Sequence, residues 1–220
     1  MNLGLNLGLS QSGSGGAAAS SALDDLKALL SGNSSIVDFT KATTGPFATT
    51  DLSDLNNTWT EKSAGTDPGV SATLGITAAG GSENIQYAHS GGDRSIIFSA
   101  NLDSSDTTQF IAMVGGTITL RAQDASTSLL STLSGTVYVD DTVLSPQDRN
   151  ALFDAARVDS EVVVKQEGAN HGTGSLFLGR SGGNGFNGSI RRCVVIDETA
   201  VTGADLTSAR SLASTWVAES

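Results

Sequence analysis

The fold class follows from residues 175–190, which read SLFLGRSGGNGFNGSI. An apolar strand comes first, then a glycine-rich turn, then a second strand from Arg191 to Ile196. Gly182-Gly183-Asn184-Gly185 lacks the Lys-Ser/Thr and the helix of a phosphate-binding loop, so we interpret it as hairpin chemistry. A helix is predicted over 204–217, on the apolar spacing of Leu206 to Trp216. This order of elements predicts an all-β fold.

The rest of the chain also divides into short strands bounded by turn residues. Gly115-Gly116 predicts a two-residue hairpin. No long helical pattern separates the strands, which favours a sandwich or jelly roll over a parallel α/β sheet. The predicted strands are Ile36–Thr40, Thr58–Lys62, Ala72–Ala78, Asn84–His89, Ser95–Asn101, Gln109–Val114, Thr117–Gln123, Thr136–Asp140, Glu161–Gln166, Ser175–Gly179 and Ser189–Asp197.

Composition and charge narrow the class of protein. The chain has 220 residues, 26 glycines and a formal net charge of −11. Such acidity disfavours nucleic acid and anionic membranes as partners. Met1 to Ser10 lacks the features of a signal peptide, and we expect no membrane insertion. Cys193 is the single cysteine, so no intrachain disulfide forms; we expect it to be a buried apolar residue.

The N-terminal arm, residues 1–20, differs from the rest. Its leucines alternate with Gly or Asn, so they share one face of an extended segment, and a Gly/Ser-rich linker follows. We interpret the stripe as a strand or plug that docks on a partner; pairing with the protein's own sheet is the alternative. The predicted partner-binding residues are Leu3, Leu5, Leu7 and Leu9.

Two further helices are predicted. Residues 21–31 form the first, capped by Ser21, with a leucine face that would pack against another copy or a partner. In the second, Ser145 is the expected cap, Pro146 the first helical residue, and Arg157 the end. The predicted domain organisation is therefore an arm and linker over 1–20, a short helix over 21–31, and a β-sandwich over 32–220.

Three pieces of the chain carry a family resemblance. They are Val37-Asp38-Phe39-Thr40 with Thr44-Gly45-Pro46-Phe47 and Trp59, the block Leu176 to Ile196, and the closing segment Leu206 to Trp216. Together they resemble a concanavalin A-like (laminin-G-like) jelly-roll domain of bacteriophage virion structural proteins. Leu3-Gly4-Leu5 and Leu7-Gly8-Leu9 resemble the short N-termini of some phage tail and head-appendage proteins. The resemblance implies a concanavalin-like β-sandwich with short peripheral helices and an extended N-terminal arm.

The sequence contains neither the glycosidase motif nor the serine-hydrolase motif that would indicate catalysis. Glycosidases on this fold carry paired carboxylates on one strand face, and no Glu-x-Asp-x-Glu pattern occurs. Asp197 and Glu198 are adjacent and so point in opposite directions. His89 and His171 lie beside loops without a nucleophile elbow. We expect a non-enzymatic protein without a cofactor.

The candidates for metal binding and for ion pairs are individual residues and not spaced motifs. Laminin-G-like domains often hold one Ca²⁺, and Asp140-Asp141, Asp103 with Asp106, and Asp93 are loop acids of the right type. The alternative is that these aspartates serve turns and caps. For Arg191-Arg192 we expect salt bridges to a neighbouring acid.

Two functions follow from these features. The first is a phage virion structural protein, a head-surface or tail appendage assembled in the host cytoplasm. Other virion proteins would hold it through residues 1–31, and it would display the jelly roll for host adhesion. The second is a lectin-like module that recognises host glycans; few aromatic residues look free for stacking on sugars. A symmetric homo-oligomer is expected, with a trimer favoured.

Overall fold

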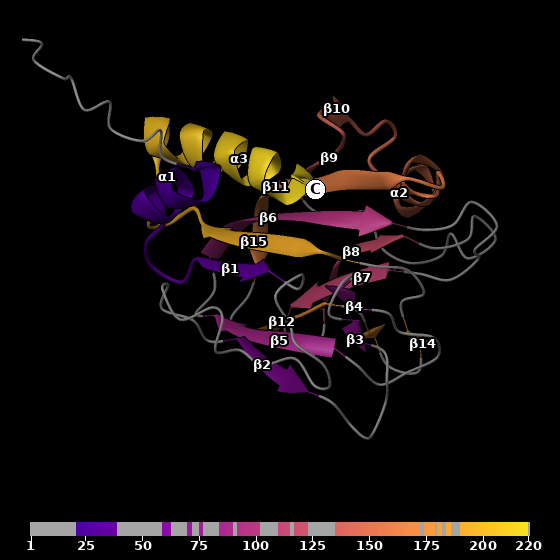
Figure 1. The fold of residues 1–220 in the computed structure, drawn as a ribbon. Helices are drawn as coiled ribbons and strands as arrows, with labels where there is room; N and C mark the ends of the chain where they lie inside the picture. Colours follow the sequence, from indigo (N-terminus) through magenta and orange to yellow (C-terminus); the bar gives the residue numbers. More distant parts are fainter. Residues whose placement is uncertain are drawn as a thin grey trace, which may run out of the picture.

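The chain folds as an all-β sandwich with short helices at its periphery, in a computed structural model. Two antiparallel sheets form the layers, and two of the three helices in the described residues lie on the outer face of one of them (Figure 1). The structure describes residues 21–38, 59–62, 70–71, 75–76, 84–89, 92–101, 110–114, 117–122, 135–171, 174–178, 180–181, 184–185 and 190–219. The N-terminal arm lies outside these ranges.

The larger sheet has six strands, all paired antiparallel. In spatial order they are β1 (Ser35–Asp38), β15 (Arg192–Asp197), β6 (Gly92–Asn101), β11 (Glu161–His171), β9 (Thr136–Val139) and β10 (Thr142–Val143). The first and last strands of the domain are thus neighbours.

The smaller sheet has five strands, β2 (Trp59–Lys62), β5 (Asn84–His89), β12 (Gly174–Leu178), β7 (Phe110–Val114) and β8 (Thr117–Ala122), in that spatial order. Val114 pairs with Thr117, as the predicted two-residue turn at Gly115-Gly116 requires. Two small hairpins complete the strands. They are β3 (Val70–Ser71) with β4 (Gly75–Ile76), where one strand over Ala72–Ala78 was predicted, and β13 (Arg180–Ser181) with β14 (Asn184–Gly185).

The predicted hairpin between residues 175 and 196 is wrong in its pairing. β12 lies between β5 and β7 in the smaller sheet, whereas β15 lies between β1 and β6 in the larger one. The glycine-rich segment turns back on itself as β13–β14, with Ser181 opposite Asn184. A connection between the two layers therefore occupies this stretch. Short-range patterns identify a strand and a turn, but they do not say which sheet the next strand joins.

The three helices begin and end close to their predicted bounds: α1 (Ala22–Leu29), α2 (Arg149–Ala156) and α3 (Gly203–Ala218). Ser21 caps α1 as predicted, since its hydroxyl accepts from the Asp24 N–H at 3.1 Å. The cap predicted for α2 is wrong. Asp148, not Ser145, accepts from the Ala151 N–H at 2.9 Å, and Pro146 lies before the helix. The helix starts three residues later than predicted, and the Asp148 carboxylate accepts from the N–H of its third residue.

The inner face of the larger sheet is apolar. Alternate residues of β6, β11 and β15 point toward the smaller sheet, because side chains on a strand alternate between faces. Phe98 of β6 lies opposite both Val164 and Cys193, and all three are fully buried. The predicted buried position of Cys193 is confirmed.

The outer face of the same sheet forms a second core beneath α1 and α3. Ile97, Val194 and Ile196 meet Leu26 of α1 and Trp216 of α3 there, all at most 2% exposed. The leucine face of α1 is therefore occupied within the chain. This corrects the expectation that the leucine face of residues 21–31 packs against another copy or a partner, because Leu26 is fully buried and Leu30 nearly so.

Candidate functional site

Most predicted site residues fall outside a common site. Leu3, Leu5, Leu7 and Leu9 lie outside the described residues, as do Asp103 and Asp106. The side chains of His89 and His171 are likewise not described. The predicted ion pairs of the adjacent arginines are confirmed: Arg191 binds Glu161, and Arg192 lies 3.8 Å from Asp38.

Asp140 and Asp141 form the turn between β9 and β10. Both have positive φ, 46° and 63°, as a two-residue hairpin turn of type I′ demands. The Asp140 carboxylate accepts from the Val163 N–H at 2.8 Å, while Asp141 binds Lys165. Asp93 uses its carbonyl to accept from Glu198 N–H and from Arg94. Within the described ranges, His, Cys, Asp and Glu side chains form no group of three that could hold a metal.

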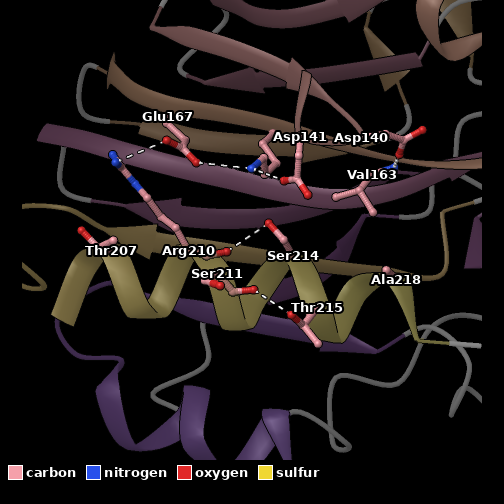
Figure 2. Close-up of a pocket in the computed structure, with 11 residues that line it drawn as sticks. Asp140, Asp141, Val163, Glu167, Thr207, Arg210, Ser211, Ser214, Thr215 and Ala218 are labelled. Atoms are coloured by element: carbon pink, nitrogen blue, oxygen red, sulfur yellow. Dashed lines mark hydrogen bonds and ion pairs between the residues drawn. The ribbon is translucent and has the colours of Figure 1, made fainter. Parts of the chain in front are cut away.

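A groove opens where the helices leave the larger sheet uncovered. α3 packs over β6 and also contacts β15 and β11, and the outward side chains of Val163, Lys165 and Glu167 on β11 line the groove beside it. The groove has a volume of about 550 Å³ and lies between α3, β11 and the β9–β10 turn (Figure 2). Its lining residues are Asp140, Asp141, Val163, Lys165, Glu167, Thr207, Arg210, Ser211, Ser214, Thr215 and Ala218.

Lys165 stands at the centre of the groove floor. Its Nζ lies 2.7 Å from an Asp141 oxygen, 3.9 Å from Glu167, and 4.7 Å from the centre of the Tyr138 ring. Lys165 and Tyr138 are direct cross-strand neighbours on the same face of the sheet. The ammonium is thus held in one position by two carboxylates and a ring face.

Arg210 of α3 closes the groove at its other end. Its guanidinium lies 3.3 Å from Glu167, donates to Glu198 at 2.7 Å and donates to Ser95 at 3.0 Å. Glu167 therefore bridges the two cations of the groove, as Figure 2 shows. Because every cation here has a carboxylate partner, the groove is polar but has no exposed single charge of positive sign.

Glu198 supports Arg210 from below the groove. Burial raises the pKa of this carboxyl, but hydrogen bonds from Ser95, Arg210 and the Gly168 N–H, with the charge of Arg210, outweigh burial. The net pKa of Glu198 is below its usual value. The neighbouring Asp197 diverges from it, as predicted, and contacts Arg94 and Asn33 instead.

The wall of the groove is a row of hydroxyl groups on α3. Thr207, Ser211, Ser214 and Thr215 recur at helical spacing on the side that faces β11. Three of them donate to the carbonyl four residues earlier: Thr207 to Gly203, Ser214 to Arg210 and Thr215 to Ser211. The donor of each of these hydroxyls is thus used, and its lone pairs remain as acceptors.

Of the residues that line the groove, our sequence interpretation singled out Asp140 and Asp141, as loop acids for a metal, but not Lys165, Arg210 or the hydroxyl residues of α3. Two signals were present: the charged residues Lys165 and Glu167 lie on one face of β11, and hydroxyl residues line one side of α3. Neither signal shows that the two surfaces meet, because β11 and α3 are separated by more than 30 residues.

Comparisons with known proteins add little to this geometry. No protein-family model and no curated protein matches the chain. Among solved structures, the chain is similar to the one described as "CBM35 from Cellvibrio japonicus Abf62". The identity is 10% and the TM-score 0.26, over 74% of this chain and 92% of that chain. A TM-score this low carries no argument about function, and the concanavalin-like, phage-virion assignment stays a prediction.

Proposed function

We propose that the protein is a non-catalytic binding module that takes a glycan in the groove between α3 and β11. The observation that carries the proposal is the pairing of an acceptor wall with a fixed polar floor. Ser214 and Thr215 offer oxygen lone pairs from the helix, while Lys165 and Arg210 offer N–H groups from positions fixed by carboxylates. A ligand that both donates and accepts hydrogen bonds along its length, as a polyol does, suits such a site.

The pKa and the ion-pair partners of the carboxyl groups in and beside the groove support binding rather than hydrolysis. A glycosidase needs a carboxylic acid with a raised pKa to protonate the leaving oxygen. Glu198, which binds the groove residue Arg210, has a lowered pKa and is hydrogen-bonded to Ser95 and Arg210. In the groove, Asp141 is paired with Lys165, and Glu167 is shared between two cations.

The test is binding of the whole chain to an array of neutral and acidic glycans, followed by isothermal titration with the best ligand. We expect the double variant S214A/T215V to lose binding. Ser208 is exposed on α3 and does not line the groove, so S208A is the matched control and should bind like the parent. Absence of binding to every glycan, or equal binding by S214A/T215V and the parent, would refute the proposal.

A second candidate, attachment to a virion through the N-terminal arm, is supported by the position of α1. Because Leu26 of α1 is part of the core, the residues that follow the arm belong to the body of the sandwich. A partner that held Leu3, Leu5, Leu7 and Leu9 would therefore hold the whole domain. The virion location, the trimeric state and the role of the arm stay predictions.

The position of α1 also sharpens the experiment. Deletion of residues 1–20 keeps the Ser21 cap and the Leu26 packing, so the sandwich should keep its thermal unfolding midpoint. Loss of incorporation into particles with an unchanged midpoint supports attachment through the arm. Unchanged incorporation contradicts it. A deletion that extends to residue 31 would also remove core side chains, so loss of attachment could not be told from loss of stability.

A further inference from the structure

We infer that the ligand of this groove is a neutral oligosaccharide of several units that lies along the axis of α3. The inference rests on the proposed function and concerns the class, charge and length of the glycan. Three features of the groove lead to it: its length, its acceptor chemistry and its charge.

The length of the groove follows from the helix that forms its wall. The lining residues of α3 run from Thr207 to Ala218, eleven residues apart. At the rise of an α-helix this distance is about 16 Å. β11 supplies the opposite side over Val163, Lys165 and Glu167, so both walls are elongated in the same direction (Figure 2). A single sugar ring would leave much of such a groove unfilled, whereas a chain of rings would contact its whole length.

The acceptor chemistry decides how the ligand is oriented. Thr207, Ser214 and Thr215 have already used their donors on the helix backbone, so they bind O–H groups of the ligand as acceptors. Across the groove, Lys165 of β11 is a donor only, and so is Arg210, whose guanidinium reaches from α3 to Glu167 of β11; both bind ligand oxygens. Each hydroxyl of a neutral sugar can both donate and accept a hydrogen bond, and hydroxyls lie on both edges of the ring. One edge would face α3 and the other the sheet.

The charge of the groove argues against acidic sugars. Asp140, Asp141 and Glu167 supply three carboxylates against the two cations Lys165 and Arg210. Both cations are already neutralised, at 2.7 Å from Asp141 and 3.3 Å from Glu167. A ligand carboxylate or sulfate would have to displace one of these partners while it approached the other, in a chain with a net charge of −11. Neutral hydroxyls meet no such penalty.

The experiment is isothermal titration of the whole chain with two matched series. One contains neutral glucan, galactan and mannan oligosaccharides of one to six units, and the other contains galacturonate oligomers of the same lengths. We expect affinity to rise with length in a neutral series and to exceed that for the acidic oligomer at least 10-fold. T215V removes one acceptor and should weaken the neutral hexamer by between about 2-fold and 10-fold, whereas S208A should not. Neutral binding should be almost insensitive to added salt.

The outcomes separate this inference from the proposed function. Tighter binding of galacturonate oligomers, or equal affinity for a monosaccharide and a hexamer, would overturn the neutral, extended ligand while leaving a glycan-binding groove in place. Binding of no glycan, here or on the array, would overturn both. Neutral binding that T215V and S214A leave unchanged would contradict the orientation along α3.

Discussion

The guanidinium of Arg94 lies 2.7 Å from the carboxylate of Asp197, and both side chains are almost fully buried. Asp197 also accepts from the Asn33 N–H at 2.9 Å and from the Thr199 hydroxyl at 2.6 Å. One carboxylate therefore joins β6, β15, the turn before α3, and the segment between α1 and β1. The ends of the domain are held together at this point, below the same sheet that carries the groove.

Loss of the Asp197 charge should destabilise the fold strongly. D197N keeps the shape of the side chain but removes the negative charge that pairs with the buried Arg94 guanidinium. Removal of one partner from a buried ion pair costs about 3–5 kcal/mol of unfolding free energy. Urea denaturation measures the change. D154N, on the exposed side of α2, is the control and should stay within about 0.5 kcal/mol of the parent. A similar small effect for D197N would contradict the role of this pair.

Stability should fall in acid because of Asp197 and Glu198. Burial raises the pKa of Asp197, but hydrogen bonds from Thr199 and Asn33 and the charge of Arg94 outweigh it, so its pKa is lowered, as is that of Glu198. A lowered folded-state pKa means that the unfolded chain binds more protons in acid. The stabilisation is complete above the unfolded pKa, near 4, and is lost as the pH falls through the folded value. Urea midpoints between pH 6 and pH 2 should show this decline. E198Q should reduce its slope, and an unchanged slope would speak against the assignment.

Substitution by alanine should destabilise the protein more at Gly32 than at Gly203, although the two glycines have similar φ angles. At φ +63° a Cβ on Gly32 would lie 2.5 Å from the Ala200 Cβ and 2.8 Å from an Asp197 oxygen. Gly203 has φ +60°, and no atom lies within 4 Å of its Cβ position. G203A should therefore cost only the left-handed conformation, about 1–2 kcal/mol. We expect G32A to cost more, because Asp197 must also shift. Equal urea midpoints for the two variants would show that the Asp197 region adapts freely.

The Cys193 thiol should be inert in the folded protein. Burial raises the pKa of this thiol far above its usual value, and the side chain is fully enclosed. The thiolate is the reactive form, so a thiol reagent such as an aromatic disulfide should react only as the protein unfolds. The labelling rate in native buffer should match the opening rate and rise steeply through the urea transition. V143C, at an exposed position of β10, provides a thiol that should react at once.

The sequence predicted individual helices, strands and turns better than the elements with which they pair or pack. Asn84–His89 has the predicted bounds, and the Ser21 cap and the hairpin at Gly115-Gly116 are confirmed. These features depend on residues within a few positions of one another, such as a hydroxyl and an N–H three residues apart. The predicted cap of α2 was wrong for a local reason: Ser145 and Asp148 are both capping residue types, and the helix begins after Asp148.

The sequence by itself determined the class of the fold: many short strands with turn chemistry between them, three peripheral helices with apolar residues at helical spacing, and a net acidic composition. The tertiary structure alone decided that β12 and β15 lie in different sheets, that the leucine face of α1 is buried under α3, and that Lys165 meets Arg210 through Glu167. The physical reason is the separation along the chain between the residues that determine each feature. Side-chain alternation and helix caps are set by neighbours in the chain, whereas the groove forms only because a 16-residue helix covers part of a six-stranded sheet and leaves the rest of its face open.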